Sequence, residues 1–263
     1  MRFTKMEGLG NDYLFVYDEV PADVSEISKK LSDRHFGVGS DGMIFISSSA
    51  VADCRMRIFN ADGSEAQMCG NGIRCVGKYL FDKGYTDKTI ITVETLAGIR
   101  KLDLHLCGGV ISGVTVDMGK AVVGDKIDFE YETQTVSGTY VSMGNPHFVI
   151  FVDIVENIDI QTIGRFIEHH RMFPDGINVE FVQVISDNQI RMRVWERGSG
   201  ITCACGTGAC AGVAASVKYG YCRKNEPVSV LLDGGHLSVS VDENYAVSMT
   251  GPAKTVFEGD VEI

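Results

Sequence analysis

Polar and apolar residues alternate along several short stretches of the chain. Residues 55–59 (RMRIF) and 190–195 (IRMRVW) alternate at every second position, and residues 89–95 and 228–233 follow the same pattern. A period of two residues is typical of strands that bury one face. The stretches are short and spread along the whole chain, which predicts a fold in which strands outnumber helices.

Four other stretches have apolar residues three or four positions apart, which indicates helices. They cover residues 25–36, 72–84, 158–173 and 208–220. The second and the fourth each close on a glycine, the residue that commonly ends a helix. The fourth is rich in Ala and Gly and almost free of charge, so it is expected to be buried on all sides. The pattern as a whole predicts a mixed α/β chain.

The chain carries an internal repeat. Residues 55–85 align without gaps on residues 191–221, and eight of these 31 positions are identical. Shorter matches at an offset of 134 keep the same order along the chain. We therefore predict two halves of one ancestral fold, 1–116 and 117–250, followed by a C-terminal strand, 251–263, which could pack back on the first half.

These patterns together predict an α/β (α+β) fold of two pseudo-symmetric halves. Each half is expected to be a curved, mostly antiparallel sheet around a central apolar helix. No stretch rich in Pro, Ser or charge separates the halves, so they are expected to pack against each other, with the active site in the cleft between them.

Composition narrows the class of protein. The chain has 263 residues, of which 44% are hydrophobic and 22% charged, and its net charge is −11. The electric field of this negative net charge repels nucleic acid and anionic membranes. No apolar run approaches the roughly 20 residues that span a bilayer, and the first residues contain no apolar signal core. We expect a cytoplasmic protein with neither nucleic acid nor membrane as partner.

The repeat contains a small cassette, Cys-Gly-X-Gly, at Cys69 and again at Cys205. Each copy stands between a predicted strand and a predicted helix, so each cysteine is expected at a helix N-terminus. Free backbone N–H groups there favour negative charge. This predicts that the pKa of the thiol is lowered and that the same N–H groups can bind a substrate carboxylate. One thiolate can remove a proton while an opposite thiol delivers one, which inverts a stereocentre such as an amino-acid α-carbon without a cofactor.

The other six cysteines are expected to be reduced thiols, mostly small packing residues. Cys203 is the ambiguous one, because it lies two residues before Cys205 and could serve as a disulfide or oxidation partner. A metal or redox protein that uses Cys203, Cys205 and Cys210 is the rival class. The spacing C-X-C-X₄-C is not the usual zinc pairing, so no metal is predicted. Neither cassette extends to a dinucleotide-binding or P-loop motif.

Residues 60–74 (NADGSEAQMCGNGIR) resemble the signature of the diaminopimelate epimerase family. The resemblance extends over essentially the whole chain, through residues 5–13, 142–149, 196–211 and 249–263. It implies cofactor-independent interconversion of LL- and meso-diaminopimelate by a two-base thiol mechanism, in lysine and peptidoglycan biosynthesis. It also implies a homodimer.

The resemblance assigns roles residue by residue. Cys69 and Cys205 are similar to the two acid/base residues, and His147 and Glu196 to residues that tune the thiols and hold the substrate amine. Other positions resemble groups that hold the α-carboxylate, namely Gly70, Asn71, Gly206 and Thr207. A further set resembles groups that read the rest of the substrate, to which Glu196 also belongs: Asn11, Asn60, Asn145, Asn178 and Arg197. Five signature residues are expected to be framework: Asp41, Asp62, Ser64, Glu65 and Arg74.

Two points leave alternatives open. Some family members have glutamine after the residue that matches Asp41, where this chain has Gly42, so no role is assigned to Gly42. A racemase of a monocarboxylic amino acid with the same two-cysteine fold is the alternative function. Proline-type enzymes of that fold typically carry Cys-Gly-His-Gly, whereas this chain has Asn71 in the first cassette.

Overall fold

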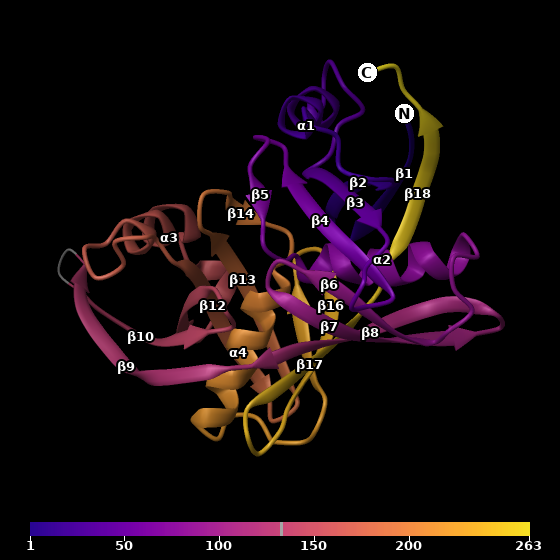
Figure 1. Ribbon diagram of the computed structural model, residues 1–263. Coiled ribbons are helices and arrows are strands. Elements are labelled where there is room, and N and C mark those ends of the chain that lie inside the picture. The colour runs from indigo at the N-terminus through magenta and orange to yellow at the C-terminus, as the bar shows by residue number, and fades with distance from the viewer. Residues whose placement is uncertain (132–133) are drawn as a thin grey trace. The chain divides into compact units, whose positions relative to one another are not determined.

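The computed structural model describes residues 1–131 and 134–263. The chain divides into two compact units (Figure 1). The first unit comprises residues 1–117 and 251–263, and the second comprises residues 118–250. The boundary at residue 117 falls within strand β8, Val110–Lys120.

The first unit begins and ends with neighbouring strands, because β18 pairs antiparallel with β1 (Figure 1). Its strands run in the order β18–β1–β2–β3–β4–β6–β7–β8, with the short β5 on β4. The pairs β2–β3 and β4–β6 are parallel and the others antiparallel. Besides β8, its elements are β1 (Arg2–Gly8), β2 (Asn11–Tyr17), α1 (Val24–Ser32), β3 (Gly42–Ser47), β4 (Cys54–Asn60), β5 (Glu65–Ala66), α2 (Gly70–Asp82), β6 (Ile90–Thr95), β7 (Gly98–Cys107) and β18 (Lys254–Asp260).

The second unit repeats this topology. Its strands run in the order β9–β10–β11–β12–β13–β15–β16–β17 with β14 on β13, and again the third pair, β11–β12, and the fifth, β13–β15, are parallel. Its elements are β9 (Val122–Tyr131), β10 (Gln134–Ser142), β11 (Pro146–Phe151), η1 (Val155–Asn157), α3 (Ile160–Glu168), β12 (Asn178–Ser186), β13 (Gln189–Glu196), β14 (Gly200–Thr202), α4 (Gly206–Lys218), β15 (Val228–Leu232), β16 (Gly235–Val241) and β17 (Ala246–Gly251).

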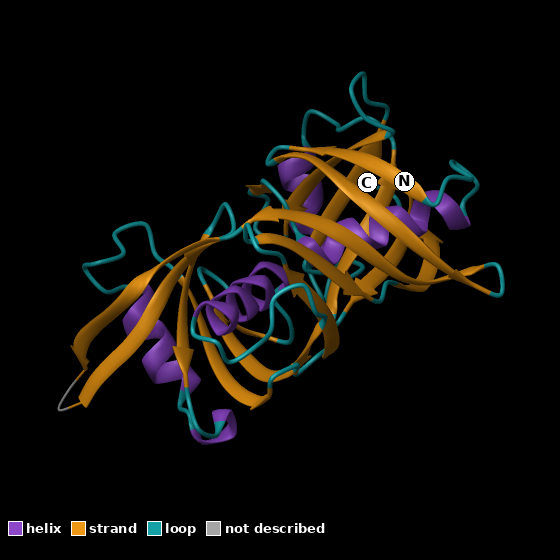
Figure 2. Ribbon diagram, turned by 90° about the horizontal axis from the view of Figure 1, so that it is seen from below, coloured by secondary structure: helices purple, strands orange, loops and turns teal. Residues whose placement is uncertain are grey.

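Each unit wraps its curved sheet around one central helix, α2 or α4 (Figure 2). All of α4 except Thr207 and Lys218 is buried, as its Ala- and Gly-rich sequence predicts. Both helices are followed by a glycine with positive φ, Gly84 at 71° and Gly220 at 74°, a conformation that glycine adopts without strain. The predicted mixed α/β fold, dominated by strands, is confirmed.

A second helix covers the other face of each sheet. In the first unit α1 contributes Ile27 and Leu31 to a cluster with Met43 and Phe45 of β3. Ile44 of β3 points the other way, because successive strand side chains alternate between faces; a Cβ added at Gly72 in α2 would lie 2.6 Å from its Cδ1. The central strands are therefore buried on both faces. No helix in the described part of the chain is long and apolar enough to cross a membrane.

Several helix boundaries differ from the sequence prediction. The two central helices start two residues earlier than predicted, at Gly70 and Gly206, because the cysteine before each acts as the N-cap. Helix α1 ends at Ser32, short of the predicted residue 36. The Asp33 carboxylate accepts the backbone N–H groups of His35 and Phe36, which turns the chain out of the helix.

Candidate active site

Cys69 is the N-cap of α2 and has an extended backbone conformation. Its Sγ accepts a hydrogen bond from the backbone N–H of Gly72 at 3.3 Å. Its thiol donates to Oδ1 of Asn11, at the start of β2, over 3.4 Å. The sequence therefore brings together two of its predicted site residues, Cys69 and Asn11, and places the sulfur against the free N–H groups of a helix start.

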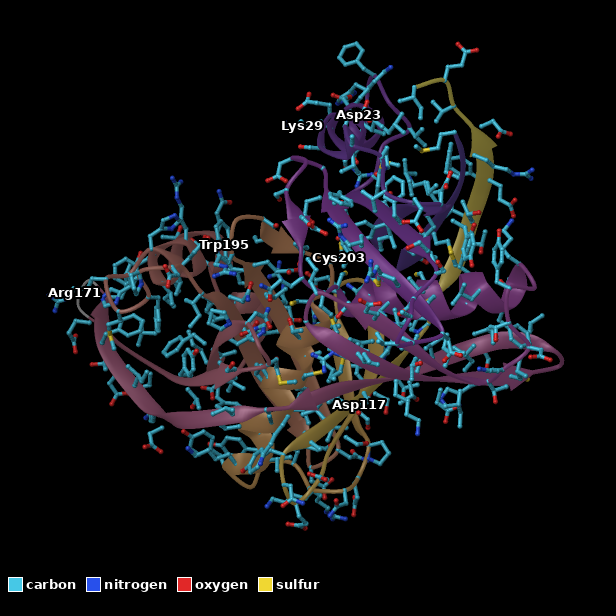
Figure 3. All side chains as sticks on the ribbon, viewed as in Figure 1. Asp23, Lys29, Asp117, Arg171, Trp195 and Cys203 are labelled. Atoms are coloured by element: carbon cyan, nitrogen blue, oxygen red, sulfur yellow. The ribbon has the colours of Figure 1, made fainter. Side chains whose placement is uncertain are left out.

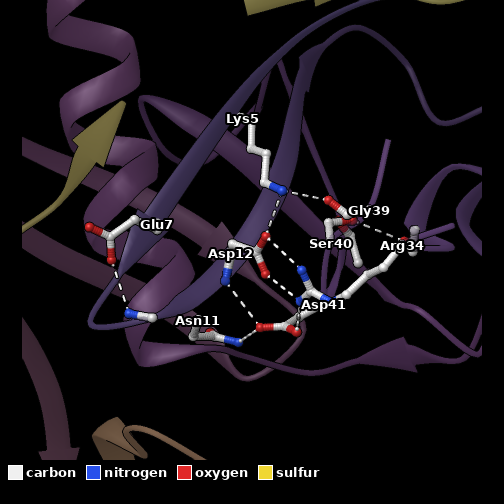
Figure 4. A network of polar contacts seen from close by, with 11 residues as sticks. Lys5, Glu7, Asn11, Asp12, Arg34, Gly39, Ser40 and Asp41 are labelled. Atoms are coloured by element: carbon white, nitrogen blue, oxygen red, sulfur yellow. Dashed lines mark hydrogen bonds and ion pairs between the residues drawn. The ribbon is translucent and has the colours of Figure 1, made fainter. Parts of the chain in front are cut away.

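The orientation of Asn11 is set by a network of charged side chains (Figure 4). Its Nδ2 donates to Oδ2 of Asp41 at 2.7 Å, and the same oxygen accepts the backbone N–H of Asp12 at 3.0 Å. Arg34 bridges the carboxylates of Asp41 and Asp12, and Lys5 pairs with Asp12 at 2.8 Å. A carboxylate only accepts, so the amide nitrogen must face Asp41 and the amide oxygen is left for Cys69.

Three further predicted residues of the first unit have structural partners. The Asn71 side chain is buried and its Oδ1 accepts from Nη2 of Arg74 at 3.0 Å. Arg74 is fully buried and also donates to the carbonyls of Gly70 and Pro252. Asn60 ends β4, and its Nδ2 donates to Oγ of Ser64 at 3.1 Å.

The framework role predicted for Arg74, Ser64 and Asp62 agrees with these contacts. The Asp62 carboxylate accepts from both the N–H and the hydroxyl of Ser64, and these bonds lower the pKa of Asp62. Gly42, left without a role, has no room for a side chain, because an added Cβ would lie 2.2 Å from the carbonyl oxygen of Phe59.

Cys205 is the N-cap of α4 and has the same geometry as Cys69. Its Sγ accepts the backbone N–H of Gly208 at 3.3 Å and lies 3.5 Å from Oγ1 of Thr207. The residue is only 5% exposed. Burial raises the pKa of the Cys205 thiol well above its ordinary value, and the carboxyl group of Glu196 raises it further.

The expected lowering of the thiol pKa at a helix start is therefore wrong for Cys205. The hydrogen bonds from Thr207 and Gly208 do lower the pKa, but they are outweighed by burial and by the neighbouring carboxyl group of Glu196. In this structure the second cassette favours a protonated thiol, the form that can donate a proton.

Glu196 ends β13, and its Oε1 accepts the hydroxyl of Thr202 in β14. Burial raises the pKa of Glu196, while hydrogen bonds to Thr202 and Cys205 oppose that rise. The carboxyl group therefore stands next to the Cys205 thiol, as the resemblance implies for this position.

Two more predicted residues of the second unit, His147 and Asn145, also lie at this helix start. His147, in β11, is fully buried, with Nδ1 2.7 Å from Oε1 of Glu180 and Nε2 3.1 Å from Oδ1 of Asn145. Asn145 donates through Nδ2 to Oγ1 of Thr207 at 3.2 Å.

Asn178, the first residue of β12, is hydrogen-bonded to Arg197, which directly follows β13. Asn178 donates to the carbonyl of Pro146 at 3.0 Å and accepts the backbone N–H of Arg197 at 2.9 Å. The Arg197 guanidinium donates to the carbonyl of Asp175. In the described residues no carboxylate is paired with Arg197, which leaves donors for an anion.

All eight cysteines are free thiols. Cys54, Cys75, Cys210 and Cys222 are buried, whereas Cys107 and Cys203 are exposed; Cys203 lies between β14 and α4 (Figure 3). Among the residues that the structure describes, no three His, Cys, Asp or Glu side chains are grouped so that they could hold a metal ion.

The sequence reasoning missed Glu180. This carboxyl group lies in β12 at the position that Ile44 occupies in β3 of the first unit, since both strands pair in the same register with their neighbours. The available signal was a charged residue in the stretch 177–182 (INVEFV), where every other residue except Asn178 is apolar. Thr202, whose hydroxyl donates a hydrogen bond to Glu196, has no feature in the sequence that indicates this contact.

Comparisons with known proteins identify the family of the chain. A family model described as Diaminopimelate epimerase matches residues 3–124 and 139–256. A protein of Acetivibrio thermocellus named diaminopimelate epimerase is 51% identical over 279 residues, covering 100% of this chain and 99% of the relative. One of the same name from Methanococcus maripaludis is 48% identical over 280 residues, covering 100% of both chains.

Solved structures show the same fold at low sequence identity. A phenazine biosynthesis protein of the PhzF family from Bacillus anthracis has a TM-score of 0.81 and 18% identity, covering 100% of this chain and 99% of that one. A hydroxyproline epimerase from Agrobacterium vitis has a TM-score of 0.74 and 17% identity, covering 98% and 91%. With a family match over most of its length and relatives about half identical from end to end, the chain belongs to the diaminopimelate epimerase family.

Proposed function

We propose that the protein is an isomerase that interconverts LL- and meso-diaminopimelate without a cofactor, a step of lysine and peptidoglycan biosynthesis. Family membership supports the reaction. The observation that carries the chemistry is the pair of cysteine N-caps: Cys69 and Cys205 start equivalent helices, and each sulfur sits against backbone N–H groups.

The proton balance requires two groups with opposite protonation. A thiolate takes the α-hydrogen from one face of the substrate, and a thiol gives a proton to the opposite face. After one turnover the first sulfur is a thiol and the second a thiolate, so the reverse reaction resets the pair. The raised pKa of Cys205 makes it the proton donor of the ligand-free protein. Cys69 is then the base, and it must first give up the hydrogen that it donates to Asn11 Oδ1.

The first N–H groups of each central helix, at Gly70 and Asn71 in α2 and at Gly206 and Thr207 in α4, are proposed donors to the α-carboxylate of the substrate. Negative charge that develops on this carboxylate when the α-proton leaves is stabilised by the same N–H groups and by the helix dipoles. The glycines let the backbone approach the ligand.

The distal end of the substrate is a second amino acid, which needs donors for its carboxylate and acceptors for its ammonium group. Arg197 supplies a planar guanidinium for the carboxylate. The side chains of Asn11, Asn60, Asn145 and Asn178 supply both donors and acceptors. Glu196 and His147 are proposed to hold the reacting amine and tune the Cys205 thiol.

The substrate is tested by incubating the purified protein in D₂O with LL-diaminopimelate, meso-diaminopimelate, lysine, proline and histidine. Chiral chromatography with mass spectrometry reads both stereochemistry and deuterium. We expect diaminopimelate alone to be epimerised, with one solvent deuterium at the α-carbon of the product. Turnover of lysine or another monocarboxylic amino acid in its place would support the alternative racemase.

We further propose a cytoplasmic homodimer. Every residue of β18 except Gly259 is exposed, including the apolar side chains of Val256 and Phe257. Exposed apolar strands are commonly covered by a partner. Light scattering coupled to gel filtration should give twice the mass of the 28.6 kDa chain; a mass equal to one chain would contradict the dimer.

A further inference from the structure

A continuous chain of hydrogen bonds joins Glu180 to the Cys205 sulfur. It runs from Glu180 Oε1 to His147 Nδ1 (2.7 Å) and from His147 Nε2 to Asn145 Oδ1 (3.1 Å). It continues from Asn145 Nδ2 to Thr207 Oγ1 (3.2 Å) and ends on Cys205 Sγ (3.5 Å). All five residues belong to the second unit, and they come from β11, β12, α4 and the residues that precede β11 and α4.

The structure places the amide nitrogen of Asn145 toward Thr207, and this placement gives the hydrogen-bond chain its direction. The amide nitrogen donates to Thr207, so the amide oxygen faces His147. An amide oxygen accepts only, which means that His147 Nε2 must carry a hydrogen. Thr207 already accepts from Asn145, so its own hydroxyl hydrogen is available for the sulfur of Cys205.

The proton count of the buried pair follows from the same geometry. With Nε2 protonated, one more hydrogen must lie between Nδ1 and Oε1 of Glu180, because two lone pairs would otherwise face each other at 2.7 Å. The pair then has no net charge, whichever atom holds that hydrogen. This fits the burial of both side chains, which are 0% exposed, and the lack of a hydrogen-bond partner on Glu180 Oε2.

We propose that Glu180 is a positioning residue of the reaction, which keeps His147 protonated on Nε2 and thereby directs the Thr207 hydroxyl toward Cys205 once that thiol has released its proton. The proposal rests on the acid/base role proposed above for Cys205. The first unit lacks this hydrogen-bond chain, because Ile44 occupies the position of Glu180 there.

Space also favours this role. A Cβ added at Gly208 would lie 2.7 Å from Glu180 Oε1, so the glycine of the cassette lets the carboxyl group approach the first turn of α4. The groups that bear on the Cys205 sulfur are Glu196 from β13, Glu180 from β12, His147 from β11 through the hydrogen-bond chain, and Thr207 and the Gly208 N–H from α4. A bare carboxylate at position 180 would oppose the thiolate, whereas a neutral pair would not.

The direct test is the ¹⁵N NMR signature of His147 in the labelled protein without substrate. The chain has six histidines, and a His147→Gln variant identifies the resonances. We expect the shift of a protonated Nε2 between pH 6 and pH 9. The shift of an unprotonated Nε2 would overturn the proposal whatever the substrate proves to be, and a protonated Nε2 in a protein inactive on diaminopimelate would count against the proposed function alone.

The functional test compares Glu180→Gln, Glu180→Ile and the exposed control Glu243→Gln. The glutamine amide can donate to Nδ1 and keep Nε2 protonated, so we expect kcat within about tenfold of the parent. Isoleucine, the residue of the first unit, leaves Nδ1 without a partner, and kcat should fall by about 100-fold or more with a smaller change in KM. Parental activity of Glu180→Ile in a folded protein would overturn the proposal.

A second readout remains decisive if Glu180→Ile fails to fold. The rate of Cys205 alkylation by iodoacetamide is followed against pH by peptide mass spectrometry, in a Cys203→Ala background that removes the exposed neighbour. Glu180→Gln should keep the parental profile, and a folded Glu180→Ile should need higher pH. A profile of Glu180→Gln shifted to lower pH would show that Glu180 acts as a bare charge and would overturn the proposal.

Discussion

Cys205 caps its helix as Cys69 caps its own: each sulfur accepts a backbone N–H three residues on, at 3.3 Å. Their surroundings differ. Cys69 is partly exposed and donates to an amide oxygen, whereas Cys205 is buried beside carboxyl groups. The same backbone device thus holds two thiols in different electrostatic environments, as a reaction that needs one acid and one base requires.

The environment of Cys205 predicts how its reactivity changes with charge. Glu196→Gln removes a carboxyl group that raises the Cys205 pKa, so a larger fraction of thiolate should form at a given pH. We expect alkylation of Cys205 at pH 8 to be about three to ten times faster than in the parent, equivalent to a shift of about half to one pKa unit. Peptide mass spectrometry after timed iodoacetamide treatment measures the rate. The exposed variant Glu226→Gln is the control, and slower alkylation in Glu196→Gln would contradict this reading of the site.

The Asp41–Asn11 bond predicts a loss of activity from a residue that need not touch substrate. Asp41→Ala removes the acceptor that orients the Asn11 amide, and hydrogen bonds to charged groups contribute about 1.5–3 kcal/mol. We expect kcat/KM for diaminopimelate to fall by about 10- to 100-fold.

Arg34→Ala provides the matched control for Asp41→Ala. It removes the half-exposed guanidinium that Asp41 shares with Asp12 and leaves the Asn11–Asp41 bond in place. Because exposed ion pairs contribute about 0–1 kcal/mol, kcat/KM should stay within about threefold to fivefold of the parent. Equal losses in the two variants would mean that the charge network, and not the orientation of Asn11, matters.

The buried thiols predict a loss of stability at alkaline pH. Burial raises the pKa of Cys54 and of Cys75 to about 12, whereas an unfolded thiol has a pKa of about 8.5. Above that lower value the unfolded chain releases protons that the folded chain retains. Stability is therefore complete below about pH 8.5 and falls toward pH 12, by about 1.4 kcal/mol per pH unit for each thiol.

Urea unfolding of the parent and of Cys54→Ala between pH 8 and pH 11, with a reducing agent present, measures this linkage. Cys54→Ala has lower stability at pH 8, because it loses packing, but the free energy of unfolding should decline less steeply with pH. The difference in slope should approach about 1.4 kcal/mol per pH unit. Parallel curves for the two proteins would show that Cys54 does not titrate on unfolding.

The periodic patterns predicted the fold class well because they report burial directly. Alternation at residues 55–59 and 190–195 gave β4 and β13, and the Ala- and Gly-rich run gave the buried helix α4. The predicted ends of helices were less accurate where a side-chain hydrogen bond ends the helix. Asp33 ends α1 by accepting N–H groups outside the helix, and no periodicity signals such a bond.

The candidate site was predicted less completely. The motif marks residues whose chemistry is unusual in context, such as Cys69 and Cys205. It gives no account of what surrounds them, and the expected lowering of the thiol pKa overlooked how deeply Cys205 is buried. Glu180 was missed because its role depends on a partner 33 residues away, His147, which only the pairing of β11 with β12 brings beside it.

The central claim is that each of the two cysteines is needed as an acid or a base. Cys69→Ala, Cys205→Ala and the control Cys203→Ala should be assayed with LL- and meso-diaminopimelate in D₂O, with stereochemistry and deuterium read together. We predict that both active-site variants lose epimerisation by about 10³-fold or more in each direction, while Cys203→Ala keeps the parental rate. Turnover within about tenfold of the parent by either Cys69→Ala or Cys205→Ala, in both directions, would contradict the two-base account.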